Sequence, residues 1–194
     1  MRGLGTAVRL AVGFAIGLGL WSLFSQPYER LVAPAAEAAL RLMEHPAVTR
    51  LDAPGREFIV RRSDFPPASP RPGLPARDLH FNFVLLVALF ALDRHPWRGD
   101  RVGRLLLASA GLFAVHVAAL VFQVESVYAT SLGAWSAAHY GALSRNFWAG
   151  GFHFYQIAGR FAAPFALWWL IGRTESVPAS DTLRGTRRTR KQRG

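Results

Sequence analysis

WAGGFHFYQIAGRFAAPFALWWLIG, residues 148–172, is long and apolar enough to cross a membrane as a helix, and it carries Arg160 near its middle. A guanidinium keeps its charge inside proteins, so a partner, a water-filled cavity or a function must offset its cost in hydrocarbon. His153 and Gln156 lie seven and four residues before Arg160, which predicts that the three share one helical face. We therefore expect this face to point at protein rather than at lipid.

The composition also favours a membrane protein. Hydrophobic residues make up 51% of the 194 positions, which is high for a soluble domain. The length allows one domain. The chain contains no cysteine, which excludes disulfides, thiolate metal sites and a cysteine nucleophile within it.

The net charge of +11 is distributed unevenly along the chain. Most of it lies in three segments beside the apolar stretches: the N-terminus with Arg2 and Arg9, residues 93–104, and residues 173–193. Positive residues next to membrane spans mark the cytoplasmic side. We therefore expect a multi-pass membrane protein with cytoplasmic N- and C-termini. This distribution indicates contact with the lipid bilayer and argues against a nucleic-acid partner.

The apolar stretches predict an all-α membrane protein with four transmembrane helices. These helices are expected at residues 7–24, 79–92, 102–124 and 148–172. The remaining segments are expected to form a cytoplasmic loop at 93–101, an external loop at 125–147 and a disordered basic cytoplasmic tail at 173–194. A cleaved signal peptide is the alternative for the first helix. Gly13 and Gly17 within it form a GxxxG pattern, which permits close helix packing.

A small external α+β segment, residues 25–78, is predicted between the first and second helices. Apolar residues from Tyr28 to Met43 recur at helical spacing, which indicates an amphipathic helix. Residues 47–51 and 57–62 flank the turn sequence Asp-Ala-Pro-Gly, which predicts a β-hairpin. Residues 65–75 contain five prolines and are expected to form an extended connector.

Polar residues of the third predicted helix repeat the pattern of the fourth. Ser109, His116 and Gln123 are each seven residues apart and share one helical face. At 1.5 Å per residue, His116 and Arg160 both fall near the middle of the membrane, so we expect them to face each other. Pro164 cannot donate a hydrogen bond to the carbonyl of Arg160, which predicts a kink at the level of the charge.

Further polar residues gather toward the outer side of the membrane, where we predict contacts with a substrate or a partner. The predicted contact residues are Arg160, Gln156, His153, His116, Gln123, Asp78, Asn82, Glu125 and Arg145. The alternative is that such side chains only form hydrogen bonds between helices. No two histidines have a metal-binding spacing, so neither a metal nor a cofactor is predicted.

Two segments carry a family resemblance. One is Asn82-Phe83-Val84-Leu85-Leu86 followed by Ala88-Leu89-Phe90, and the other comprises Arg145-Asn146-Phe147, Tyr155-Gln156-Ile157-Ala158-Gly159 and Ala163-Pro164-Phe165-Ala166-Leu167-Trp168. In these segments the chain resembles the exosortase H-associated membrane proteins of bacteria. The resemblance implies a location in the bacterial inner membrane and an accessory role beside an exosortase, a membrane enzyme that acts on tagged envelope proteins. Exosortases use Cys, Arg and His, and this chain has no Cys.

Three functional interpretations are open at this point. The first is an accessory protein of an exosortase-type sorting system that contacts the partner enzyme or an exported substrate. The second is an intramembrane enzyme, acyltransferase-like or peptidase-like, that acts on lipid or lipoprotein at the outer leaflet. In that case His153 or His116 would be the general base, and Arg160 would hold a phosphate or carboxylate. The third is a structural subunit of a membrane complex.

Overall fold

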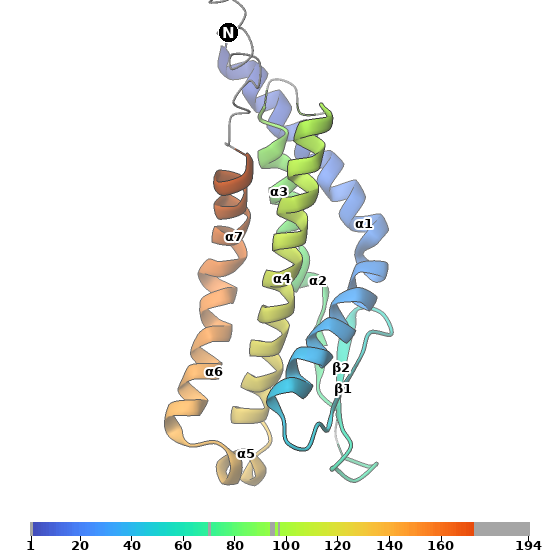
Figure 1. Cartoon of the computed structure of the whole chain (residues 1–194), viewed down its shortest axis with the longest axis vertical. Coiled ribbons are helices and arrows are strands. Elements are labelled where there is room, and N and C mark those ends of the chain that lie inside the picture. The colour runs from blue at the N-terminus through green and yellow to red at the C-terminus, as the bar shows by residue number, and fades with distance from the viewer. Residues whose placement is uncertain (1, 70, 94–95, 97, 173–194) are drawn as a thin grey trace, which may run out of the picture.

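The structure is a computed structural model that describes residues 2–69, 71–93, 96 and 98–172 (Figure 1). The described chain is mostly helical and contains one small three-stranded sheet, as the sequence predicts in outline. Two of its helices are long and apolar enough to cross a membrane, one covering Gly5–Met43 and the other Gly99–Thr130. The predicted basic tail, residues 173–194, lies outside the described residues.

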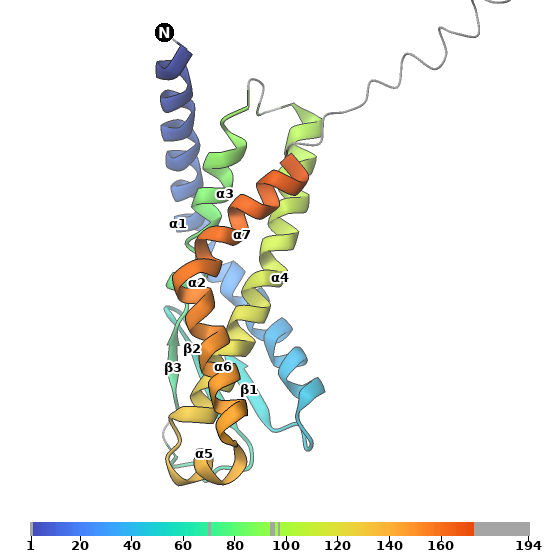
Figure 2. The same ribbon diagram turned by 90° about the vertical axis from the view of Figure 1, so that its left-hand side faces the viewer.

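The first helix, α1 (Arg2–Met43), is continuous where the sequence predicts a membrane helix followed by a separate amphipathic helix. Pro27 and Pro34 both lie inside it. A proline removes one backbone hydrogen bond and bends a helix, and Figure 2 shows that the two halves of α1 run in different directions. The second half of the helix has an apolar face to bury, with Val32 and Leu40 fully enclosed.

Three antiparallel strands pack beside the second half of α1. Strands β1 (Thr49–Asp52) and β2 (Glu57–Arg62) form the predicted hairpin, and β3 (Gly73–Pro75) pairs with the free edge of β2. The sequence predicts an extended connector at β3, because prolines surround it. Proline is tolerated at a sheet edge, so the connector can still add a short strand. The core between the sheet, α1 and α4 includes Val32, Leu40, Leu51, Phe58, Val60, Leu74, Leu120 and Val124.

The second predicted membrane helix, residues 79–92, is divided in the structure. Helices α2 (Arg77–His80) and α3 (Phe83–Phe90) are separated by Phe81 and Asn82. Eight residues of α-helix span about 12 Å, which is less than half the thickness of the bilayer core. Most side chains of α3 are buried, and the helix lies against α1, α4 and α7.

The remaining helices form a long pair joined at one end of the molecule. Their bounds are α4 (Gly99–Thr130), α5 (Ala134–His139), α6 (Ala142–Phe154), η1 (Tyr155–Gly159), α7 (Arg160–Leu167) and η2 (Trp168–Gly172). The segments η1 and η2 are π-helical, and residues 142–172 form one column without a break. Figure 2 shows that this column bends between α6 and α7. A π-helical turn and Pro164, which lies within α7, are both known causes of helix bending.

Two glycines let α1 approach α3 closely. A Cβ atom added at Gly13 would lie 2.3 Å from the Cβ of Ala91, and one added at Gly17 would lie 3.0 Å from the carbonyl oxygen of Val84. Both distances are too short for an unstrained contact. The GxxxG pattern therefore allows the backbones of α1 and α3 to pack at a distance that larger residues would prevent.

Replacing Gly13 with alanine should lower the unfolding free energy by about 1–3 kcal/mol, because overpacking forces α1 away from α3. The matched control is Gly19→Ala, since no atom lies within 4 Å of the added Cβ at that position. Both substitutions gain the same helix propensity, about 1 kcal/mol, so their difference isolates the packing effect. Thermal unfolding in detergent measures it, and equal stability of the two variants would contradict the close contact.

Candidate functional site: a buried polar network

The first part of the network joins α1 to α2. Nε2 of His80 lies 3.1 Å from a carboxylate oxygen of Glu29, and the indole N–H of Trp21 donates to Nδ1 of His80 over 3.0 Å. An indole nitrogen only donates, so Nδ1 is the acceptor. The proton of a neutral His80 is therefore on Nε2, which donates to Glu29. Glu29 and His80 are each 2% exposed, so the pair is enclosed by protein.

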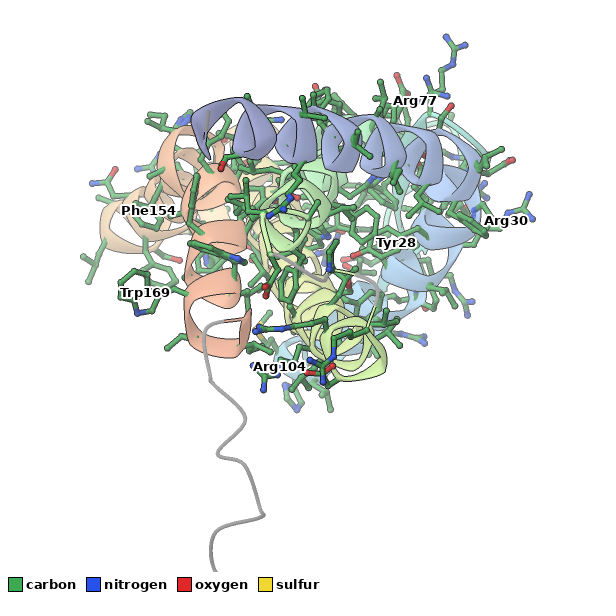
Figure 3. All side chains as sticks on the ribbon, turned by 90° about the horizontal axis from the view of Figure 1, so that it is seen from above. Tyr28, Arg30, Arg77, Arg104, Phe154 and Trp169 are labelled. Atoms are coloured by element: carbon green, nitrogen blue, oxygen red, sulfur yellow. The ribbon has the colours of Figure 1, made fainter. Side chains whose placement is uncertain are left out.

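The second part joins α1 to α4 and to the α2–α3 junction. The hydroxyl of Tyr28 lies 2.6 Å from Nδ1 of His116, and Nε2 of His116 lies 2.7 Å from the amide oxygen of Asn82. An amide oxygen only accepts, so Nε2 carries the proton and Nδ1 accepts from Tyr28. His116 is fully buried. Figure 3 shows Tyr28 directed into the bundle and Arg30, two residues later, directed away from it.

The two parts meet at Tyr28. Its ring lies edge-on to both histidines, with ring centroids 5.3 Å from His80 and 5.7 Å from His116. Glu29 follows Tyr28 in the chain, so adjacent residues of α1 supply a carboxylate acceptor to one histidine and a hydroxyl donor to the other. Tyr28 and Glu29, from a single turn of α1, therefore tie this helix to α4 and to α2, and Trp21 adds a second contact to α2.

Asn82 occupies the junction where α2 and α3 separate. Its amide oxygen accepts from His116, but its amide nitrogen is buried without a hydrogen-bond partner among the described residues. A buried donor without a partner costs about 1–3 kcal/mol. This nitrogen is therefore the least satisfied polar group of the network.

Arg160 and Tyr155 contact the same junction from the C-terminal column. Nη2 of Arg160 donates to the carbonyl oxygen of Asp78 over 2.7 Å, and the hydroxyl of Tyr155 donates to the carbonyl oxygen of Leu79 over 2.6 Å. The last carbonyls of a helix have no intrahelical N–H partner, and α2 consists of only four residues. The two side chains therefore satisfy backbone groups that the division of the helix leaves open.

The structure does not pair Arg160 with His116, although the sequence predicts that they face each other. Each is hydrogen-bonded to other groups: Arg160 to the backbone of α2, and His116 to Tyr28 and Asn82. His153 is exposed at the surface of α6. The π-helical turn of η1 separates it from Arg160. Such a turn shifts the helical register by about one residue, or roughly 100°, so the seven-residue spacing no longer aligns the two side chains.

The other predicted contact residues lie in several environments. Gln123 and Glu125 are buried in α4, and Glu125 accepts a hydrogen bond of 2.8 Å from the hydroxyl of Tyr140. Gln156 is half-buried, and Arg145 is exposed. The network thus includes His116, Asn82, Arg160 and the backbone of Asp78, whereas His153, Arg145 and Glu125 lie outside it.

The predicted contact residues do not include three network residues of α1, which are Trp21, Tyr28 and Glu29. The sequence assigns Tyr28 and Glu29 to an interfacial helix, where polar residues are ordinarily solvated. A signal was nevertheless present: Trp21, Ser25 and Tyr28 are four and three residues apart, which places them on one helical face. A polar stripe that crosses the expected boundary at residue 25 indicates one continuous helix with a buried polar side.

The described part of the chain contains no group of three or more His, Cys, Asp or Glu arranged to hold a metal ion. Comparison with known proteins identifies no relative: no family model, no curated protein and no solved structure matches the chain.

Replacing Glu29 with alanine should lower the unfolding free energy by about 1–3 kcal/mol, because the buried Nε2–H of His80 loses its acceptor. Arg30→Ala, which alters the next residue of the same helix on its outward side, should leave stability nearly unchanged. Removing both partners, in Glu29→Ala with His80→Leu, should cost less than the sum of the two single substitutions. Thermal unfolding in detergent measures the unaltered chain, the two single variants, the double variant and Arg30→Ala, and strict additivity would contradict a direct interaction.

Proposed function

We propose that the chain is a multi-pass inner-membrane protein that binds a partner, and that its polar network positions helices rather than catalysing a reaction. The occupancy of the two histidines carries this proposal. Every ring nitrogen of His80 and His116 lies within 3.1 Å of a partner in the protein. A general base needs a free lone pair within reach of its substrate. Neither imidazole offers one in this arrangement.

Four membrane crossings belong to the same proposal. The column of residues 142–172 is continuously helical, α3 lies against α1, α4 and α7, and α2 contacts α4. Irregular backbone at membrane depth is tolerated where protein satisfies its polar groups. Tyr155 and Arg160 provide those hydrogen bonds at the α2 carbonyls. The shortness of α3 is therefore compatible with a second crossing.

The distribution of charge supports an orientation with the N-terminus inside. In Figure 1 the N-terminus of α1 and the start of α4 lie at one end of the molecule, whereas the sheet and α5 lie toward the other. Arg98, Arg101 and Arg104 belong to the first end. Basic residues next to membrane helices favour the cytoplasmic side. The sheet and α5 would then face the opposite side of the membrane.

The C-terminal column offers a broad apolar surface for a partner. Helix α6 has no buried side chain, and Phe154, Ile157, Phe161 and Trp169 along the column are each more than half exposed. Figure 3 shows Phe154 and Trp169 directed outward from this column. The second segment that resembles exosortase H-associated proteins lies on the same column. This coincidence supports an accessory role in which the column contacts an exosortase-type membrane enzyme.

An intramembrane enzyme is the second candidate, favoured by one observation. An apolar pocket of about 160 Å³ lies beside His80, between Leu20, Phe24 and Phe83. An acyl chain placed there would be adjacent to the Glu29–His80 pair. For His80 to act as a base, its Nδ1 would have to release the indole N–H of Trp21. Turnover of a lipid or lipoprotein by the purified chain, lost in a folded His80→Gln variant, would favour this candidate.

Co-expression with a cysteine-dependent exosortase-type enzyme should allow the two proteins to be purified together in mild detergent. Phe154→Ala combined with Phe161→Ala should reduce recovery of the enzyme several-fold, because the contact surface on the column is lost. Leu23→Ala is the control, since Leu23 is 75% exposed but lies on α1. Failure to recover the enzyme with the unaltered chain would contradict the proposed partner.

The absence of cysteine allows a direct test of orientation. Cysteines can be introduced singly at Gly55, in the hairpin turn, and at Gly99, at the start of α4, because both positions have open space around an added side chain. A membrane-impermeant maleimide applied to intact spheroplasts should label Gly55→Cys and not Gly99→Cys. Both should react after lysis. The reverse pattern in intact cells would overturn the proposed topology.

A further inference from the structure

A second polar site lies apart from the network, where α1 ends and α5 begins. It is an open pocket of about 400 Å³. Helix α4, α5, the end of α1 and the segment after β2 contribute its walls. The residues that matter for its chemistry are Glu44, Arg62, Asp64, Glu125, Trp135 and Tyr140.

Arg62, the one arginine among the residues that line this pocket, is already engaged. Its guanidinium lies 3.4 Å from a carboxylate oxygen of Glu44 and 2.9 Å from one of Asp64. The hydrogen bond from Arg62 holds the pKa of Asp64 below its ordinary value, which keeps that carboxylate charged. One positive charge is therefore shared between two negative charges, and the three residues together retain one negative charge.

Glu125 adds a carboxylate without a cationic partner. Its side chain is 6% exposed and forms no ion pair within the described residues. The hydroxyl of Tyr140 donates to one carboxylate oxygen over 2.8 Å. Burial and the nearby charge of Glu125 raise the pKa of Tyr140 well above its ordinary value, so the phenol remains a donor. Burial raises the pKa of Glu125, because removal from water disfavours the charged carboxylate. A cation beside it would stabilise the charged form far more than one neutral hydrogen bond does.

Aromatic rings complete the pocket. Trp135, Tyr140 and Trp148 line it together with the carboxylates. The faces of aromatic rings attract guanidinium and ammonium groups. Arg62 shows this preference within the molecule, because its guanidinium carbon lies 4.6 Å from the ring centroid of Trp135 and 4.9 Å from that of Tyr128. Trp135 is also stacked by His139, so Tyr140 and Trp148 are the rings that offer this chemistry to a second cation that reaches Glu125.

We infer that this pocket binds the cationic side chain of a peptide, an arginine or a lysine, whose charge pairs with Glu125 while its apolar stem lies against the aromatic rings. Arginine is the better fit, because a planar guanidinium can stack on a ring and pair with a carboxylate at the same time. A zwitterionic phospholipid headgroup fits less well, because its phosphate would enter a pocket with net negative charge. The inference is independent of the proposed membrane partner and holds whether or not that partner binds the column.

The test uses the full-length chain in detergent and a fluorescent peptide, Gly-Gly-Arg-Gly-Gly, followed by fluorescence anisotropy. A second peptide carries citrulline, which has nearly the shape of arginine without its charge. We expect the arginine peptide to bind at least tenfold more tightly than the citrulline peptide. Glu125→Gln should weaken binding of the arginine peptide about tenfold while preserving the hydrogen bond from Tyr140. Glu57→Gln is the control, because Glu57 is exposed and lies outside the pocket.

Two variants of His139 test the inference independently, in case Glu125→Gln misfolds. His139 lines the pocket and is exposed, and its ring stacks on Trp135. His139→Arg should place a cation of the chain's own in the pocket and abolish peptide binding, whereas His139→Gln should retain it. Equal binding of the two peptides, or unchanged binding in His139→Arg, would overturn the inference. Displacement of the arginine peptide by micelles of an ethanolamine phospholipid, but not by anionic micelles whose lipid has no amine, would assign the pocket to a lipid amine. That result would also overturn the inference.

Discussion

The hydrogen bonds from Arg160 and Tyr155 to the backbone of α2 are the interactions on which the rest of the structure depends. A helix divided at Phe81 and Asn82 exposes carbonyl groups that have no backbone donor. In apolar surroundings each unpaired group costs several kcal/mol. The guanidinium and the phenol satisfy the carbonyls of Asp78 and Leu79, and the carbonyl in turn gives the permanently charged Arg160 an acceptor. The carbonyl and the guanidinium thus each provide the hydrogen-bond partner that the other needs.

The fixed junction determines how α1 joins the bundle. Because α2 ends beside α1, His80 lies within reach of Glu29 and Trp21, and Asn82 lies within reach of His116. The close approach of α1 to α3 through its glycines extends the same interface toward the N-terminus. The network and the glycine contact therefore stabilise one arrangement of α1, α3 and α4, and a change in either would displace the helices that the other positions.

The two polar sites of the molecule differ in how completely their polar side chains are paired with partners in the protein. In the network, both ring nitrogens of each histidine are occupied, and Glu29 is enclosed with His80. In the pocket beside α5, the carboxylate of Glu125 accepts from a neutral donor and forms no ion pair with the residues that the structure describes, and aromatic rings line the open space. A closed set of partners suits a structural role. An unmatched charge in an open pocket suits ligand binding, which is why the two sites carry different proposals.

The sequence by itself determined the mostly helical class, the hairpin around Pro54 and Gly55, and the placement of Arg160 in an apolar helix, because each follows from local patterns of apolar, turn and charged residues. It could not determine that α1 is continuous, since proline and a polar stretch ordinarily end a membrane helix. It also could not identify the partner of Arg160. That partner is a backbone carbonyl, which every residue carries, and a π-helical turn alters the facing that regular spacing predicts. Only the tertiary structure decided these points, because they depend on contacts between segments about eighty residues apart in the chain.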